Sequence, residues 1–188
     1  MPTIFSHAIV AATMGMAMRG SSPVPRRIYG LGAIASVIPD ADVIMFAFGF
    51  PYEHPLGHRG LSHAPAFAAA AAVAFTWLSP ASSHDRFTPK WLWTYFFLAM
   101  ASHGVLDAMT TGGRGIAFLA PFSGERFFLP WRPILVSPIG VRFFSERGLN
   151  VIVSELLWIG LPCVLVVGLV LLIRMRRAAA QGQGPASR

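Results

Sequence analysis

The chain has 188 residues, of which 54% are hydrophobic and only 12% are charged. Soluble globular proteins carry about 25% charged residues, so this composition excludes an ordinary soluble domain and indicates one compact bundle of membrane helices. The net charge of +7 would suit a nucleic-acid partner. The basic residues, however, lie in short loops and a tail beside apolar runs, as membrane proteins place them, so we expect no nucleic-acid partner.

The only cysteine, Cys163, lies inside an apolar run. It has no second cysteine for a disulfide or a cysteine-based zinc site. The N-terminal residues show neither a basic region nor a cleavage site of the usual form, so we expect no cleaved signal peptide. Any metal site must therefore use histidine, aspartate and glutamate.

Five apolar segments follow one another along the chain, and we expect each to form a membrane helix. They are residues 3–18, 28–50, 63–79, 91–113 and 151–173. The first and third are short against the roughly 20 residues of a full span. Pro39 interrupts the second, because proline removes a helix hydrogen bond. Thr88-Pro89 is a good start for the fourth, and Gly112-Gly113 is a good end.

The sequence thus predicts an all-α integral membrane protein. Residues 1–173 would form a bundle of about five membrane helices, and residues 174–188 a flexible basic tail. With five crossings, nine basic residues fall on the side of the C-terminal tail and six on the other side. The positive-inside rule then places the C-terminus in the cytoplasm.

The ionisable groups within or beside the apolar segments gather on the other, outer side. They are His7, Asp40, Asp42, His54, His58, His63, His103, Asp107 and Glu155. Such groups are costly inside a membrane and are functional candidates by default. Their gathering predicts a single polar site near the outer membrane face.

His103 and Asp107 stand four residues apart in the fourth segment, which places them on one face of a helix. An imidazole and a carboxylate so placed form half of a metal site. A buried carboxylate must be paired, bind a metal or stay protonated, and no basic residue lies nearby within the segments. A hydrogen bond that packs two membrane helices is the alternative.

Two further motifs offer the other half of the site. Asp40 and Asp42 place two carboxylates at the helix break, where a cation would relieve their repulsion. A polar helix end, with Asp42 as the N-cap, is the alternative. His58 and His63 flank Arg59; imidazole binds Zn, Mn, Fe and Ni, and a guanidinium can hold a phosphate or carboxylate.

His7 and Glu155 are individually weaker candidates. His7, near the start of the first segment, could equally be an interfacial residue. Glu155 lies about one turn into the last segment, where the helix N-terminus favours the carboxylate. The chain also has four Ser-His pairs, but neighbours in sequence lack the nucleophile–base geometry of a serine hydrolase, and no G-x-S-x-G motif is present.

At these residues the sequence resembles the bacterial inner-membrane-associated metal-dependent hydrolases of the LexA-binding type. The matching pieces run in order: His7, Pro39-Asp40-x-Asp42, His58-Arg59-Gly60-x-Ser62-His63, Ser102-His103-x-x-x-Asp107 with Thr110, and Pro133-Ile134-Leu135-Val136. Glu155 matches a late acidic position. No motif for LexA itself is visible, and we do not adopt that association.

That family is distantly similar to zinc-dependent phospholipase C and the P1-type nucleases, helical enzymes that hydrolyse phosphoesters with a zinc cluster bound by His, Asp and Glu. The resemblance implies a similar site in this chain. Its metal ligands would be His7, Asp40, Asp42, His58, His63, His103, Asp107 and Glu155.

We therefore expect a membrane-bound metal-dependent hydrolase near the outer face of the bacterial inner membrane, with Zn²⁺ or Mn²⁺. The metal would activate a water, Asp40 or Asp42 would act as general base, and Arg59 would hold the anion of a phosphoester or lipid-linked substrate. Two other classes stay open. An ion-binding or transport protein would need polar residues leading to both sides, and a non-catalytic membrane scaffold would bind no stoichiometric metal.

Overall fold

The computed structural model describes residues 1–20, 23–79, 87–138 and 140–182. These residues form helices and no strand, with two isolated β-bridges between loops. The α-helices are α1 (Ile4–Met18), α2 (Arg26–Val37), α3 (Pro65–Leu78), α4 (Pro89–Ala108), α5 (Glu146–Glu155) and α6 (Leu161–Gly182). The 3-10 helices are η1 (Ile38–Phe48), η2 (Leu61–His63) and η3 (Gly140–Phe143), and η4 (Leu156–Gly160) is a π-helix. The all-helical class is confirmed.

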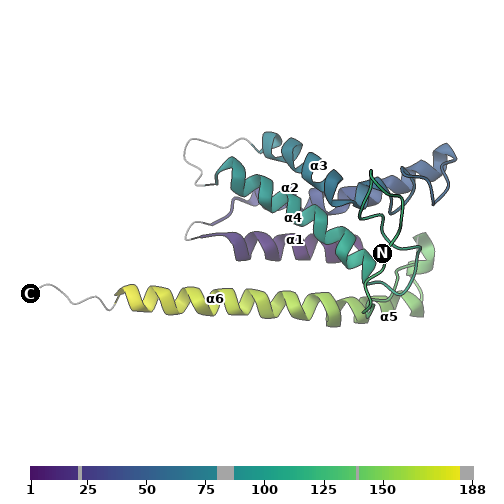
Figure 1. The fold of residues 1–188 in the computed structure, drawn as a ribbon. Coiled ribbons are helices and arrows are strands. Elements are labelled where there is room, and N and C mark those ends of the chain that lie inside the picture. The colour runs from purple at the N-terminus through teal and green to yellow at the C-terminus, as the bar shows by residue number, and fades with distance from the viewer. Residues whose placement is uncertain (21–22, 80–86, 139, 183–188) are drawn as a thin grey trace, which may run out of the picture.

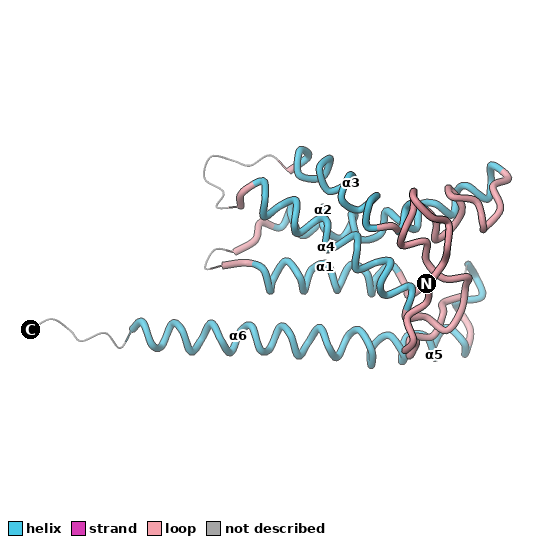
Figure 2. Tube along the Cα trace, in the orientation of Figure 1, coloured by secondary structure: helices cyan, strands magenta, loops and turns pink. Residues whose placement is uncertain are grey.

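Helix α4 is the centre of the bundle. It packs against α1, α2 and α3, while α6 lies along α1 and extends beyond the bundle (Figures 1 and 2). The apolar core surrounds Tyr95, Phe96 and Met100 of α4. A side chain at Gly32 of α2 would collide with the Tyr95 ring, so glycine permits the close approach of α2 and α4.

Two helices are long and apolar enough to cross a membrane by length and composition. They are the continuous helices Arg26–Phe48, made of α2 and η1, and Glu146–Ala180, made of α5, η4 and α6. Helices α1 and α3 have 15 and 14 residues, so each is about 22 Å long against a hydrocarbon core of about 30 Å. The structure thus has two candidate membrane spans among the described residues, and the count of five stays a prediction.

Helix α4, which we expected to span the membrane, is not among these two helices. It packs against α1, α2 and α3, and its His103 and Asp107 side chains are buried within the protein. Its start agrees with the sequence: the Thr88 hydroxyl accepts a hydrogen bond from the Trp91 amide at 3.2 Å. Its end differs, because α4 stops at Ala108, before the two glycines expected to close it.

The last helix is longer than the sequence predicts. It begins at Glu146 instead of residue 151 and continues through α6 to Gly182. The apolar run defines only the middle of this helix, and polar turns extend it at both ends. Residues 174–182 of the expected tail are therefore helical, while residues 183–188 lie outside the described residues.

The polar loops gather at one end of the bundle. The loops at 49–64 and 109–138 lie there together with the N-terminus and the start of α5 (Figure 1). The last turns of α1 and α3 and the first turns of α2 and α4 lie at the opposite end. The candidate ligands all belong to the first end.

Candidate metal centre

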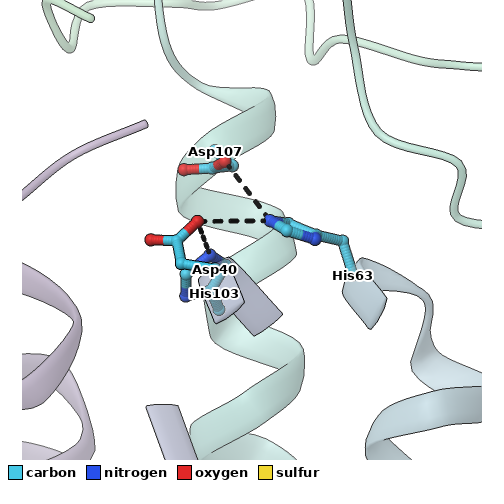
Figure 3. A group of neighbouring side chains, drawn as sticks. All are labelled: Asp40, His63, His103 and Asp107. Carbon is cyan, nitrogen blue, oxygen red and sulfur yellow. Dashed lines mark ion pairs between the residues drawn. The ribbon is translucent and has the colours of Figure 1, made fainter. Parts of the chain in front are cut away.

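Four side chains from three segments converge at this end of the bundle. Asp40 comes from η1, His63 from η2, and His103 and Asp107 from α4 (Figure 3). Each contributes one ligand atom to a group within 4.8 Å, and all four residues are buried. The Asp40 Oδ1 atom lies 3.2 Å from Nε2 of His103 and 3.6 Å from Nε2 of His63, and the latter lies 3.7 Å from Asp107 Oδ2.

The facing atoms of this group form no hydrogen bond within the described part of the chain. This holds for Nε2 of His63 and His103 and for both carboxylate oxygens of Asp40 and Asp107. Their contacts are ion pairs instead, at 3.2 to 3.7 Å within the group and at 2.9 Å between Asp107 Oδ2 and Arg59 Nε. Buried polar atoms are nearly always satisfied, and an unpaired buried carboxylate is costly. A divalent cation would satisfy all four residues at once. Imidazole nitrogen and carboxylate oxygen are ligands that zinc and manganese accept.

The opposite side of each histidine ring is anchored. His103 Nδ1 donates to the carbonyl oxygen of Ser36 at 2.7 Å, and His63 Nδ1 lies 3.2 Å from Asp42 Oδ2. Metal-binding histidines usually donate their other ring N–H to a carbonyl or carboxylate, which fixes the tautomer. Both rings therefore present an Nε2 lone pair to the centre.

The Asp42 carboxylate is already hydrogen-bonded to neighbouring residues of the protein. Its carboxylate accepts hydrogen bonds from the Arg59 amide at 3.0 Å and the Ser62 hydroxyl at 2.5 Å, and His58 Nδ1 lies 2.7 Å from it. Asp42, His58 and His63 form a second group with metal-ligand spacing. The saturated hydrogen bonding favours an orienting role for Asp42, and its predicted roles as ligand or base stay predictions.

The spacing of Asp40 and Asp42 in η1 explains why their surroundings differ. Positions two apart point in different directions in any regular helix, including a 3-10 helix with three residues per turn. Asp40 faces α4, and Asp42 faces the loop that carries His58. His63 lies between the two carboxylates and approaches each with a different ring nitrogen.

His7 lies beside the four-residue group. Its ring stacks on the His103 ring, with centroids 3.7 Å apart, and its Nε2 is 3.8 Å from Asp107 Oδ1. Neither ring nitrogen has a hydrogen-bond partner among the described residues. The structure thus brings this predicted ligand to the edge of the centre.

Arg59 is only 1% exposed, and all its nitrogens point into the protein. Its Nε is 2.9 Å from Asp107 Oδ2, and its terminal nitrogens donate to the Gly112 carbonyl and the Thr110 hydroxyl. Its φ of 64° is a strained, left-handed value, and such strain gathers at functional sites. These contacts favour a role in positioning Asp107, and the predicted role in holding a substrate anion stays a prediction.

Glu155 lies outside both groups. Its carboxylate accepts hydrogen bonds from the Thr3 amide at 2.7 Å, the Thr3 hydroxyl at 2.5 Å and the Ser6 hydroxyl at 2.6 Å. It therefore caps the N-terminus of α1, the helix that carries His7. Its role as a metal ligand stays a prediction.

The charge of the centre suits a cation. The two groups hold three carboxylates, those of Asp40, Asp42 and Asp107, and the Arg59 guanidinium pairs with the last of them. Burial lowers the pKa of His63, which lies outside both candidate spans, but the carboxylates of Asp40 and Asp42 outweigh burial and raise this pKa to about 9. A metal ion would take the place of that proton, since a ligating histidine must be neutral.

Two contributors to the centre escaped the sequence analysis. A side chain at Gly104 would lie 2.7 Å from the His63 carbonyl oxygen, so glycine lets η2 approach α4 beside His103. Glycine inside a helix lowers helix stability by about 1 kcal/mol relative to alanine, so its presence in the fourth apolar segment could have indicated a close packing contact there. The Ser36 carbonyl gave no signal, because every residue has one.

A helical bundle with apolar spans and a buried cluster of histidine and aspartate at one end defines a class of membrane protein with a candidate metal centre. The chain belongs to the YdjM inner membrane protein family, which matches residues 1–180. It is 38% identical over 170 residues to the "Inner membrane protein YbcI" of Escherichia coli (strain K12), covering 90% of this chain and 96% of that protein. No solved structure matches.

These relatives confirm that the resemblance to a bacterial inner-membrane family is correct. They place the chain in the inner membrane. Neither name specifies a reaction, a metal or a partner, so hydrolysis enters below as a proposal.

Proposed function

We propose that the protein is a membrane-bound hydrolase that uses one divalent metal, Zn²⁺ or Mn²⁺. Asp40, His63, His103 and Asp107 would hold the ion. One observation carries the proposal: Nε2 of the two histidines and the carboxylate oxygens of the two aspartates face one another without forming a hydrogen bond, while the other nitrogen of each histidine is anchored. A site built for helix packing would join these groups by hydrogen bonds to each other or to the backbone.

The ion would lower the pKa of a bound water and polarise a phosphoryl or acyl oxygen. The chain would supply the proton transfer. Asp40 forms no hydrogen bond through either carboxylate oxygen, so the oxygen that is not bound to the ion would orient or deprotonate that water. His7, whose ring stacks on the His103 ring, would hold that ligand in place. Arg59 would hold Asp107 in position.

We infer that the substrate is a phosphoester, either free or linked to a lipid. The centre lies at the loop-rich end of the bundle, away from the basic end of α6 (Figure 1). By the positive-inside rule that end would face the outer side of the inner membrane, at the level of the lipid headgroups.

A non-catalytic ion-binding protein is the second candidate. The enclosure of the centre favours it, because His63, His103 and Asp107 are at most 2% exposed. A transport role has less support: the described ionisable ligands lie at one end of the bundle, and transport needs a path to both sides.

The metal content of the purified protein tests whether these four residues bind an ion. We would measure it in detergent-purified wild type, Asp40→Asn and a His103→Ala, Asp107→Ala double variant. Ser102→Ala is the matched control, since the Ser102 hydroxyl donates to the Ala99 carbonyl and lies outside the centre. We expect near-stoichiometric metal in wild type and the control, and loss of metal in the other two at unchanged helicity by circular dichroism.

The same samples test hydrolysis of a chromogenic phosphodiester and of phospholipid vesicles. Turnover that follows the metal content supports the hydrolase. Metal without turnover supports the ion-binding protein. A wild type that takes up no metal even after reconstitution with Zn²⁺ and Mn²⁺ would rule out the proposed mechanism.

A further inference from the structure

We propose that the substrate is a membrane lipid that enters sideways from the bilayer, with one acyl chain in an apolar groove beside Asp40. This inference rests on the proposed function and names its substrate class. The groove lies between α1 and the continuous helix of α2 and η1, and its volume is about 670 Å³. Its walls include Ile4 and Ala8 of α1, Ala33 and Val37 of α2, and Ala41 and Val43 of η1.

The groove is apolar apart from one residue. Among the described residues that line it, Asp40 has the one polar side chain. An acyl chain has no hydrogen-bonding groups and loses nothing in such a groove. An extended peptide segment would leave its backbone N–H and C=O groups unpaired there, at a cost of several kcal/mol each. The lining therefore favours a hydrocarbon chain over an extended polypeptide.

The position of the groove gives it access to lipid. One wall belongs to the candidate membrane span Arg26–Phe48. Apolar side chains at its rim are about half exposed, 49% for Ile4 and 55% for Ile34. Large exposed apolar surface of this kind marks membrane or ligand contact, and in an inner-membrane protein the surrounding medium at this depth is acyl chain.

The groove leads to the candidate centre. Asp40 is part of the groove wall, and its Oδ1 lies 3.2 Å from His103 Nε2 within the centre. A lipid whose chain lies along α2 would thus bring its headgroup ester against the carboxylate that faces the metal. Because the chain would fix the ester in place, the groove would act by positioning the substrate.

A neighbouring apolar cavity provides the control. It has a volume of about 360 Å³ and is lined by Ile9, Ala12 and Tyr29, with no residue of the centre. Ala12→Trp would fill this cavity, as Ala8→Trp and Ala33→Trp would fill the groove. Ala8 and Ala12 are one turn apart on the same helix, so the substitutions are closely matched.

The experiment uses full-length protein in vesicles of phosphatidylethanolamine and phosphatidylglycerol that carry a photoreactive acyl chain. Cross-linked peptides are mapped by mass spectrometry, and metal content is measured on the same samples. We expect cross-links in α1, α2 and η1 of the wild type. Filling the groove should reduce them about tenfold in Ala8→Trp and Ala33→Trp, since it removes the contacts of a bound chain. Ala12→Trp should cross-link as the wild type does.

The outcomes separate this inference from the proposed function. Wild-type cross-links spread evenly over all lipid-facing helices, or unchanged cross-links in both groove variants at full metal content, would overturn the groove. Groove cross-links in a wild type that binds no metal would support the groove and overturn the hydrolase. With an active enzyme, the groove variants should lose hydrolysis of long-chain phospholipid and keep that of a short, soluble phosphodiester.

Discussion

Two carboxylates that stand two residues apart in η1 have different surroundings. Asp40 faces the centre and forms no hydrogen bond through either oxygen, whereas Asp42 accepts hydrogen bonds from the loop that carries His58. A carboxylate without hydrogen bonds is available to a metal, and a saturated one can hold its neighbours in place. Asp42 thus acts on the centre through the His63 ring that it orients.

Replacing Asp42 with asparagine tests whether Asp42 orients the His63 ring and leaves metal binding to Asp40. The amide cannot accept from all the donors around Asp42, so the His63 ring loses its anchor. Loss of a residue that orients a metal-binding histidine typically weakens metal binding about 10–100-fold. We expect a weaker affinity at an unchanged number of ions per chain, measured by competition with a chromogenic zinc chelator. A drop from two ions per chain in the wild type to one in the variant would instead make Asp42 a ligand of a second metal.

The sequence located the residues of the centre better than it assigned their roles. The cost of ionisable groups in apolar segments identified Asp40, His63, His103 and Asp107, and the structure brings them together. It could not tell which of Asp40 and Asp42 faces the centre, because positions two apart point in different directions in any helix and only the packing of η1 decides which of them faces α4. Nor could spacing show that Arg59 turns inward to Asp107.

The last helix, made of α5, η4 and α6, forms hydrogen bonds with both ends of α1. Glu155 accepts three hydrogen bonds at the N-terminus of α1, and Arg174 donates to the carbonyl oxygens of Met16 and Arg19 at its C-terminal end, both at 2.8 Å. An acid at a helix N-terminus and a base at its C-terminus also complement the helix dipole. Since α1 carries His7, the last helix helps to place that ring beside the centre.

The substitution Glu155→Gln tests whether Glu155 caps helix α1 or binds a metal ion. Its amide group can accept only part of the hydrogen bonds that the carboxylate accepts, which leaves donors of Thr3 or Ser6 unpaired. Each unpaired buried donor costs about 1–3 kcal/mol, so we expect a lower midpoint of thermal unfolding in detergent. Glu146→Gln, at an exposed position in the same helix, is the control and should unfold like the wild type. A cap leaves metal content unchanged, whereas a ligand would lower it.

Helix positions followed from apolar runs, but helix ends did not. The apolar pattern predicted 3–18 and 63–79, close to α1 and α3. It placed the start of the last helix at residue 151, because the turn that begins at Glu146 is polar and precedes the apolar run. Likewise the basic residues after Ile173 suggested a tail, although arginine is a good helix former and α6 continues to Gly182.

The whole molecule is polarised along its length. The candidate ligands and the polar loops lie at one end, and Arg174, Arg176 and Arg177 lie toward the other end of α6 (Figure 1). The sequence predicted this separation by counting crossings, and the arrangement of the helices agrees with it. A count of charges also assigns the basic end to the cytoplasm, which a structure without a membrane does not test.

Cysteine labelling in spheroplasts tests that orientation. In a Cys163→Ala background, Leu56→Cys would place a thiol in an exposed loop at the ligand end, and Ala178→Cys would place one near the end of α6. We expect a membrane-impermeant maleimide to label position 56 in intact spheroplasts and position 178 only after lysis. The reverse pattern would put the centre on the cytoplasmic side and restrict its substrates to that leaflet. Labelling of both positions before lysis would contradict any arrangement in which the bundle separates its two ends across the membrane.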